Sequence, residues 1–169
     1  MNRIIIAVCF YLASLAGSIQ ATTPGEIDWL GTIGHDKGND KLLFSLLFLG
    51  FFRQDLSPGC ENFRETWLQK HPFAKLVPVA LIKPLVQRDP ESQLLFVWII
   101  DQHDNLTVDL VRHGCVPATA VSTLISGARL EVSQKEFESV KAQLLTAEKL
   151  AKTEKLGIWS ADDTDEDEE

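Results

Sequence analysis

An amphipathic pattern close to the C-terminus constrains the fold of this chain more than any other feature. Ser133 and Glu136 have the spacing of a capping box, in which each residue satisfies a free backbone N–H group of the other at the start of a helix. Gly157 is suited to end such a helix. The pattern predicts a long helix whose apolar face covers a core formed by the rest of the chain. The apolar residues recur at alternating intervals of three and four, and they are Phe137, Val140, Leu144, Ala147 and Ala151.

The residues before this helix predict a strand-rich body with shorter helices. The 169 residues and the 45% share of apolar residues suit a single globular domain. The segment from Leu42 to Phe52 is almost entirely apolar, and we interpret it as a buried strand because a polar turn follows it. The predicted strands cover about 27–33, 42–52, 76–86 and 94–100, and the shorter helices cover about 61–70 and 107–112.

The first 21 residues have the pattern of a secretory signal peptide. Arg3 supplies a positive charge, an apolar stretch from Ile4 to Leu15 follows, and small residues lead to a cleavage site after Ala21. We therefore predict a secreted or periplasmic protein that has no membrane association after cleavage. An uncleaved membrane anchor is the alternative, but the apolar stretch is short for a full span. The predicted organisation is a signal peptide over 1–21, one folded domain over 22–160 and an acidic, disordered tail over 161–169.

The acidic tail accounts for most of the net charge of −8. Seven of the 24 acidic residues lie in the last eight positions, and without them 17 acidic residues face 16 basic ones. The folded body is thus close to neutral, which argues against a protein that coats nucleic acid through a basic surface. The tail is most simply a solvated end that aids solubility, and loose capture of a basic partner or of divalent cations is the functional alternative.

Signal cleavage changes the cysteine count of the chain. It removes Cys9 and leaves Cys60 and Cys115, and an even pair in an oxidising compartment is a disulfide candidate. Two buried free thiols are the alternative. Asn105 begins an Asn-Leu-Thr glycosylation sequon, which matters only if the host is eukaryotic.

Two segments of the sequence resemble a known family. Residues 147–160 read Ala-Glu-Lys-Leu-Ala-Lys-Thr-Glu-Lys-Leu-Gly-Ile-Trp-Ser, and residues 105–115 read Asn-Leu-Thr-Val-Asp-Leu-Val-Arg-His-Gly-Cys. They are similar to the Lys-rich terminal helix with its Leu-Gly-(Ile/Leu)-Trp turn, and to the Leu-Val-Arg-x-Gly segment, of staphylococcal-nuclease-like (thermonuclease) domains. The apolar run at 95–101 stands where that family has its last long strand.

The resemblance implies an α+β, mainly β fold. Its core is a five-stranded Greek-key barrel of the OB type, with helices packed around it and a long C-terminal helix. On this view the apolar stripe of the terminal helix covers the barrel, and Leu156, Ile158 and Trp159 seal its end.

The family chemistry that the resemblance implies is hydrolysis of phosphodiester bonds. Carboxylates hold a calcium ion, two arginines stabilise the charge of the transition state, and a glutamate helps to activate water. The first arginine and the metal-binding Asp belong to a motif like Arg-Leu-x-Gly-(Ile/Val)-Asp-x-Pro-Glu. Anchored on Gly50, this motif places Leu47 and Phe52 at those two positions. Anchored on Asp55, it places Gly50 at the arginine and Pro58 at the glutamate, and neither can do the chemistry.

The second arginine of the family normally opens the last long strand, within a Gly-Arg-x-Leu motif. Gln93 stands there in this chain, and it lacks the charge and the bidentate fork that bind a phosphate. Gln93 and the nearby Arg88 are therefore only weak binding candidates. The ligand itself is not predicted, although an oligonucleotide or a protein is compatible with the resemblance.

The remaining candidates for catalysis and metal binding are also weak. Arg53 and Asp55 are a possible displaced remnant of the catalytic site, and Asp36 with Asp40 is a possible displaced metal pair. Loop aspartates more often form turns. His103 and His113 lack the ligand spacing of a metal site, so we predict two surface turn histidines. No cofactor is predicted, and calcium is expected only if nuclease activity persists.

Three hypotheses follow. The first is a secreted nuclease-like domain that has lost catalysis and acts as a binding or structural module. The second is a divergent calcium-dependent endonuclease that cleaves DNA or RNA with residues such as Arg53 and Asp55. The third is a small secreted domain outside this family.

Overall fold

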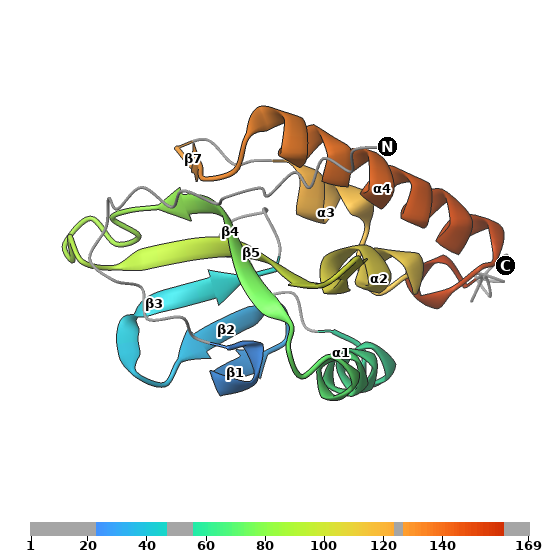
Figure 1. The fold of residues 1–169 in the computed structure, drawn as a ribbon, viewed down its shortest axis with the longest axis horizontal. Helices are drawn as coiled ribbons and strands as arrows, with labels where there is room; N and C mark the ends of the chain where they lie inside the picture. Colours follow the sequence, from blue (N-terminus) through green and yellow to red (C-terminus); the bar gives the residue numbers. More distant parts are fainter. Residues whose placement is uncertain (1–22, 47–55, 124–126, 161–169) are drawn as a thin grey trace, which may run out of the picture.

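The protein has an α+β fold in which a mixed sheet lies beside a group of helices (Figure 1). The computed structural model describes residues 23–46, 56–123 and 127–160. The strands in these ranges are β1 (Ile27–Leu30), β2 (Ile33–Asp36), β3 (Asn39–Ser45), β4 (Lys75–Ile82), β5 (Gln93–Asp101), β6 (Asp104–Asn105) and β7 (Arg129–Leu130). The α-helices are α1 (Pro58–Lys70), α2 (Leu106–Arg112), α3 (Ala118–Ser122) and α4 (Gln134–Thr153), and the short 3-10 helices are η1 (Pro24–Glu26) and η2 (Gly157–Trp159).

The sheet has the order β1-β2-β3-β5-β4-β7, and β6 pairs with β5. β1, β2 and β3 form an antiparallel meander, β3 then runs parallel to β5, and β5 is antiparallel to β4. Within the described part of the chain no strand pairing joins β1 to the opposite edge. The sheet is therefore open there, and the closed barrel expected from the resemblance stays a prediction.

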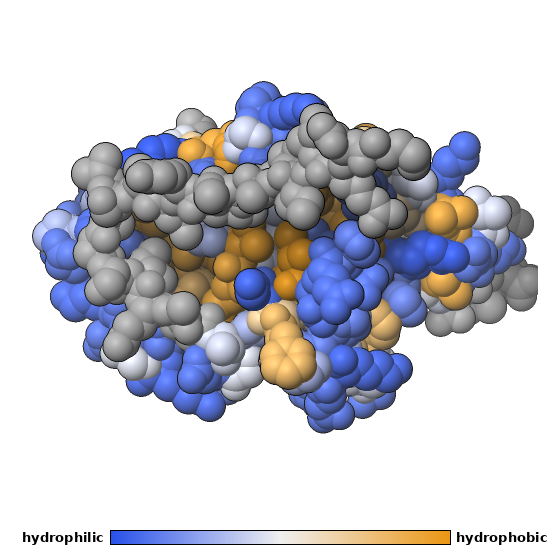
Figure 2. Space-filling view, in the orientation of Figure 1, coloured by the Kyte–Doolittle hydropathy of each residue, from blue (hydrophilic) through white to orange (hydrophobic). Residues whose placement is uncertain are grey.

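β5 is the centre of the core. Its residues from Leu94 to Ile99 are each at most 3% exposed, although successive side chains of a strand point to opposite faces. Such a continuous apolar run is typical of a strand that is covered on both faces. Apolar residues are visible over the middle of the sheet, around β4 and β5, while hydrophilic residues predominate along the lower rim (Figure 2).

α4 confirms the predicted capping box. The Ser133 hydroxyl accepts a hydrogen bond from the Glu136 N–H group, and the Glu136 carboxylate accepts one from the Ser133 N–H group at 3.0 Å. The carboxylate also accepts a hydrogen bond from the Ser133 hydroxyl, with 2.6 Å between Oγ and Oε2. This bond is the main reason that the pKa of Glu136 is lowered below its ordinary value. A cap of this kind depends only on neighbouring residues, which is why the sequence pattern is sufficient to locate it.

The apolar stripe of α4 covers other helices more than the sheet. Phe137, Leu144, Ala147 and Ala151 are buried as predicted, but α4 packs mainly on α2 and α3, which lie between it and most of the sheet (Figure 1). Phe137 does contact the strands, since its ring stacks on that of Trp98 in β5 with 6.3 Å between the ring centroids. The expectation that the stripe covers the sheet directly is therefore mostly wrong.

Several predicted boundaries are also wrong for local reasons. The strand expected at 27–33 is two strands, because Gly31 adopts a φ of 60° and turns the chain between them. The strand expected at 76–86 ends at Ile82, just before Pro84. α1 begins at Pro58, earlier than expected, since Ser57 caps it and proline suits the first helical turn. Ile158 is 50% exposed and does not seal the core. The predictions at 94–100 and 107–112 are confirmed by β5 and α2.

Candidate functional site

Gln93 begins β5 at the end of the sheet where the resemblance expects a phosphate-binding arginine. It is half-buried and pairs in parallel register with Leu42 of β3, which is buried. Arg88 lies in an exposed turn of the loop between β4 and β5. Gln93 can donate and accept hydrogen bonds through its amide, but it brings no positive charge to this position.

Two lysines at this end of the sheet already have carboxylate partners. Lys41 Nζ lies 3.3 Å from Asp89 Oδ1, and Lys83 Nζ lies 3.4 Å from Glu91 Oε2. All four side chains are at least 38% exposed, so each pair contributes about 0–1 kcal/mol. Ser92 holds the loop in shape, since its hydroxyl donates to the Asp89 carbonyl at 2.6 Å and accepts from the Val86 N–H group at 2.8 Å. The arrangement is a charge-balanced loop instead of a cluster of unpaired cations.

The two aspartates proposed as a metal pair lie in the hairpin between β2 and β3. Asp36 Oδ1 accepts a hydrogen bond from the Gly38 N–H group at 2.7 Å, so this carboxylate helps to form the turn, as loop aspartates commonly do. Asp40 is exposed on β3. No group of three or more His, Cys, Asp or Glu side chains that could hold a metal ion occurs among the described residues.

The remaining positions of the family motif lie outside the described residues. These are Leu47 and Phe52, at the positions where the resemblance expects an arginine and an aspartate, and the weak candidates Arg53 and Asp55. Their roles stay predictions.

The two histidines do not come together as a site. His103 lies in the exposed turn between β5 and β6. His113 caps the end of α2, where its Nδ1 lies 2.8 Å from the Asp109 carbonyl oxygen and its ring contacts that of Phe63 at 4.0 Å. A carbonyl can only accept, so Nδ1 carries the proton in this contact. Both histidines are exposed, as predicted.

The glycosylation sequon is part of the secondary structure. Asn105 is 8% exposed and caps α2, because its Oδ1 accepts a hydrogen bond from the Thr107 N–H group at 3.0 Å. The side chain is therefore occupied and nearly inaccessible in the folded protein.

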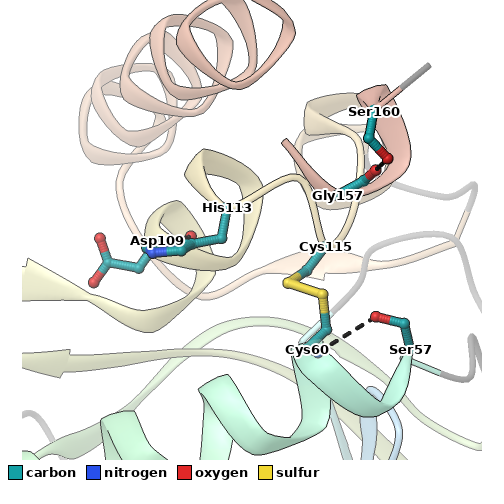
Figure 3. Close-up of a disulfide and its surroundings, with 7 residues drawn as sticks. All are labelled: Ser57, Cys60, Asp109, His113, Cys115, Gly157 and Ser160. Atoms are coloured by element: carbon teal, nitrogen blue, oxygen red, sulfur yellow. Dashed lines mark hydrogen bonds between the residues drawn. A yellow bond between two sulfur atoms is a disulfide. The ribbon is translucent and has the colours of Figure 1, made fainter. Parts of the chain in front are cut away.

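The predicted disulfide between Cys60 and Cys115 is present (Figure 3). It joins the first turn of α1 to the chain just after α2. A disulfide indicates an oxidising compartment, which is consistent with export. We call Cys60, Cys115, Gly114 and Gly157 the disulfide junction.

Gly114 and Gly157 meet backbone to backbone within this junction. Both have positive φ, 68° and 54°, and the Ile158 N–H group donates to the Gly114 carbonyl at 2.8 Å. A Cβ atom on Gly114 would collide with the Leu156 carbonyl, and one on Gly157 would collide with the Gly114 carbonyl. The two segments that carry the family resemblance are thus in direct contact. Glycine is required at both positions because the two backbones touch, and the neighbouring residues in the sequence do not reveal this contact.

α1 is attached to its surroundings through one face that carries Cys60, Arg64 and Trp67. Trp67 Nε1 donates to Asp109 Oδ2 at 2.7 Å, which links α1 to α2. Arg64 is 4% exposed, and its Nη1 donates to the Gly31 carbonyl at 2.5 Å in the turn between β1 and β2. Burial lowers the pKa of this guanidinium. Arg64 is therefore a buried link between helix and sheet.

The C-terminal end of α1 is held by a second carboxylate. His71 Nδ1 lies 3.1 Å from Asp101 Oδ2 at the end of β5, and its ring stacks on that of Trp67 at 4.0 Å. The pair of His71 with Asp101 was not predicted, because the two residues lie far apart in the sequence and in different elements.

Two hollows lie on the helical side of the molecule, away from Gln93. One has a volume of about 430 Å³ and is walled by α2 and α4, with Val108, Ala147 and Leu150 among its lining residues. The other has a volume of about 480 Å³ and is lined by both cysteines of the disulfide together with His113.

A scan against protein-family models finds no match to this chain, and a search of curated proteins finds no relative. None of the described helices is long and apolar enough to cross a membrane.

Proposed function

We propose that the chain is an exported, divergent staphylococcal-nuclease-like domain that has lost nuclease activity and acts as a binding or structural module. The single observation that carries this proposal is Gln93. It occupies the first position of β5, beside buried Leu42, where the resemblance expects a phosphate-binding arginine.

The connectivity of the sheet supports an OB-type fold. A three-stranded meander is followed by β5 inserted next to β3, with β4 outside it, and this is the strand order of a five-stranded OB barrel. α1 connects β3 to β4, and the other α-helices follow β5. The contact between Gly114 and Gly157 adds support, because it gives both resembling segments one shared structural purpose.

The charges at the Gln93 end support loss of catalysis. Stabilising a phosphoryl transition state requires cations directed at the developing charge. Lys41 and Lys83 are instead paired with exposed carboxylates, and Asp36 is engaged in its turn.

The charge balance also favours a protein ligand over a nucleic acid. OB folds use strands 2 and 3 and the loop between strands 4 and 5 to bind oligonucleotides or oligosaccharides. In this chain the body without the last eight residues carries 17 acidic and 16 basic residues. A surface of this kind gains little from the release of counterions when it meets a phosphate backbone.

The test is a cleavage assay on the full exported chain. The purified protein is incubated with single-stranded DNA and RNA, in calcium and in chelator, and we expect no chelator-sensitive cleavage. Cleavage that calcium supports, and that Arg53→Ala or Asp55→Ala abolishes, would overturn the proposal and establish a divergent endonuclease. Fluorescence anisotropy with a labelled oligonucleotide is the companion measurement, and we expect weak binding with little salt dependence.

A further inference from the structure

A hollow lies beside the disulfide, and both cysteines line it. Its volume of about 480 Å³ falls in the range of pockets that hold small molecules. Cys60 and Cys115 both line it together with Phe63 and four polar side chains, so a small molecule that enters the hollow lies beside the disulfide. These polar neighbours include Ser57, Asn62, Thr66 and His113.

The contacts that flank the disulfide do not depend on it. The Trp67 indole is bonded to Asp109 at 2.7 Å, and the rings of Phe63 and His113 meet at 4.0 Å. Each contact joins α1 to α2 or its end. We therefore expect these contacts to keep the two helices adjacent when the S–S bond opens.

We propose that this hollow is a thiol–disulfide exchange site, where a low-molecular-weight thiol reacts with Cys60–Cys115 in the folded protein. The thiolate attacks one sulfur and forms a new S–S bond to it. The bond between Cys60 and Cys115 breaks, and its electron pair leaves with the other sulfur, which takes up a proton. A second thiolate then releases the first as a small disulfide, so that two small thiols are oxidised and both cysteines are reduced.

The position of the two sulfurs sets the direction of the exchange. Cys60 lies in the first turn of α1, after Ser57 and Pro58. The partial positive charge at the start of a helix stabilises a departing thiolate. Cys60 is therefore the leaving sulfur, and the mixed disulfide forms on Cys115. This exchange does not depend on the proposed function of the sheet.

The experiment uses the oxidised full chain and reduced glutathione as the probe. Free thiols are trapped by alkylation and counted by intact mass, at several glutathione concentrations and from zero to about 1 M urea. We expect a rate that is proportional to glutathione and unchanged by urea, because the folded protein reacts. A rate that rises steeply with urea would overturn the proposal, whether or not it still depends on glutathione, because the bond would then be reached only after unfolding.

Two tryptophan variants test the hollow itself. Asn62 and Gln69 are both exposed polar residues of α1, but only Asn62 lines the hollow. Asn62→Trp should slow the reaction with glutathione by about tenfold, and Gln69→Trp should leave it within about twofold of the parent. Equal rates in the two variants contradict the site.

Thiol size and adduct position give independent readouts that need no variant. The ratio of the rate with β-mercaptoethanol to the rate with glutathione should be larger for this protein than for a small-molecule disulfide. The reason is that the lining of the hollow hinders the approach of the larger thiol. Peptide mapping of the trapped adduct should find it on Cys115, and an adduct on Cys60 would overturn the assigned direction.

Discussion

The Gln93 end of the sheet and the disulfide junction are built in different ways. At the Gln93 end, the charged side chains are exposed and meet in pairs such as Lys41 with Asp89, whose members are 49% and 38% exposed. At the junction, Gly114 and Gly157 touch through their backbones, and Cys60 and Cys115 are nearly buried. Exposed pairs contribute little to stability, whereas close backbone contact tolerates almost no added atoms. The two segments that resemble the family meet at the junction, where they hold the fold, whereas Gln93 stands where the resemblance expects an arginine.

Loss of the disulfide is expected to have the largest effect. The bond closes a loop with a sequence separation of 55, for which the chain-entropy model gives about 4 kcal/mol of stability. Replacing both residues, Cys60→Ser with Cys115→Ser, should lower the free energy of unfolding in urea by this amount and still leave a folded protein. Reductant should destabilise the parent equally and leave the double variant unchanged; a further loss in that variant would show that reductant acts elsewhere.

Gly157→Ala should cost slightly less, about 3 kcal/mol. The positive φ accounts for about 1–2 kcal/mol, and the collision with the Gly114 carbonyl adds the rest. Gly127→Ala is the matched control, because Gly127 also has a positive φ of 89° but no atom within 4 Å of the added Cβ. If urea unfolding shows equal losses in the two variants, the backbone contact at the junction contributes nothing.

Asp109→Ala should cost about 2 kcal/mol, since it leaves the Nε1 of the buried Trp67 without an acceptor. Asp109→Asn keeps an acceptor oxygen and should cost no more than about 1 kcal/mol. Urea unfolding followed by tryptophan fluorescence measures both. Equal costs would mean that the hydrogen bond is not what stabilises this contact.

The smallest effect is expected at the Gln93 end. A double-mutant cycle with Lys41→Ala and Asp89→Ala should give a coupling below about 0.5 kcal/mol, which vanishes in about 1 M salt. A coupling as large as the effect of Gly157→Ala would remove the contrast between the two regions.

The parts of the fold that short-range patterns specify were predictable. The capping box of α4 needs only Ser133 and Glu136. The continuous apolar run of β5 is sufficient to predict a strand that is buried on both faces. The split between β1 and β2 was not predictable in this way, since it depends on the left-handed conformation of Gly31. The helix α3 was missed because its five residues are too few to show a period.

The candidate site was predictable only where a single position decides it. Gln93 at the start of β5 follows from the strand boundary and its neighbours in the sequence. The buried Arg64, the pair of His71 with Asp101 and the contact of Gly114 with Gly157 each join segments far apart in the chain. Such contacts depend on how the elements pack, which residue type and spacing do not encode. The disulfide was one of two open alternatives for the same reason, because sequence does not report the distance between two sulfurs.

The parallel pairing of β3 with β5 also has a consequence for how fast the protein folds. β4 and β5 are joined by the segment 83–92, whereas all of α1 and β4 lie between Leu42 and its partner Gln93. Contacts between distant parts of a chain carry a loop-closure cost before they return any stability, and folding rates fall as such contacts increase. The docking of the N-terminal meander onto β5 therefore carries a larger loop-closure cost than the pairing of β4 with β5.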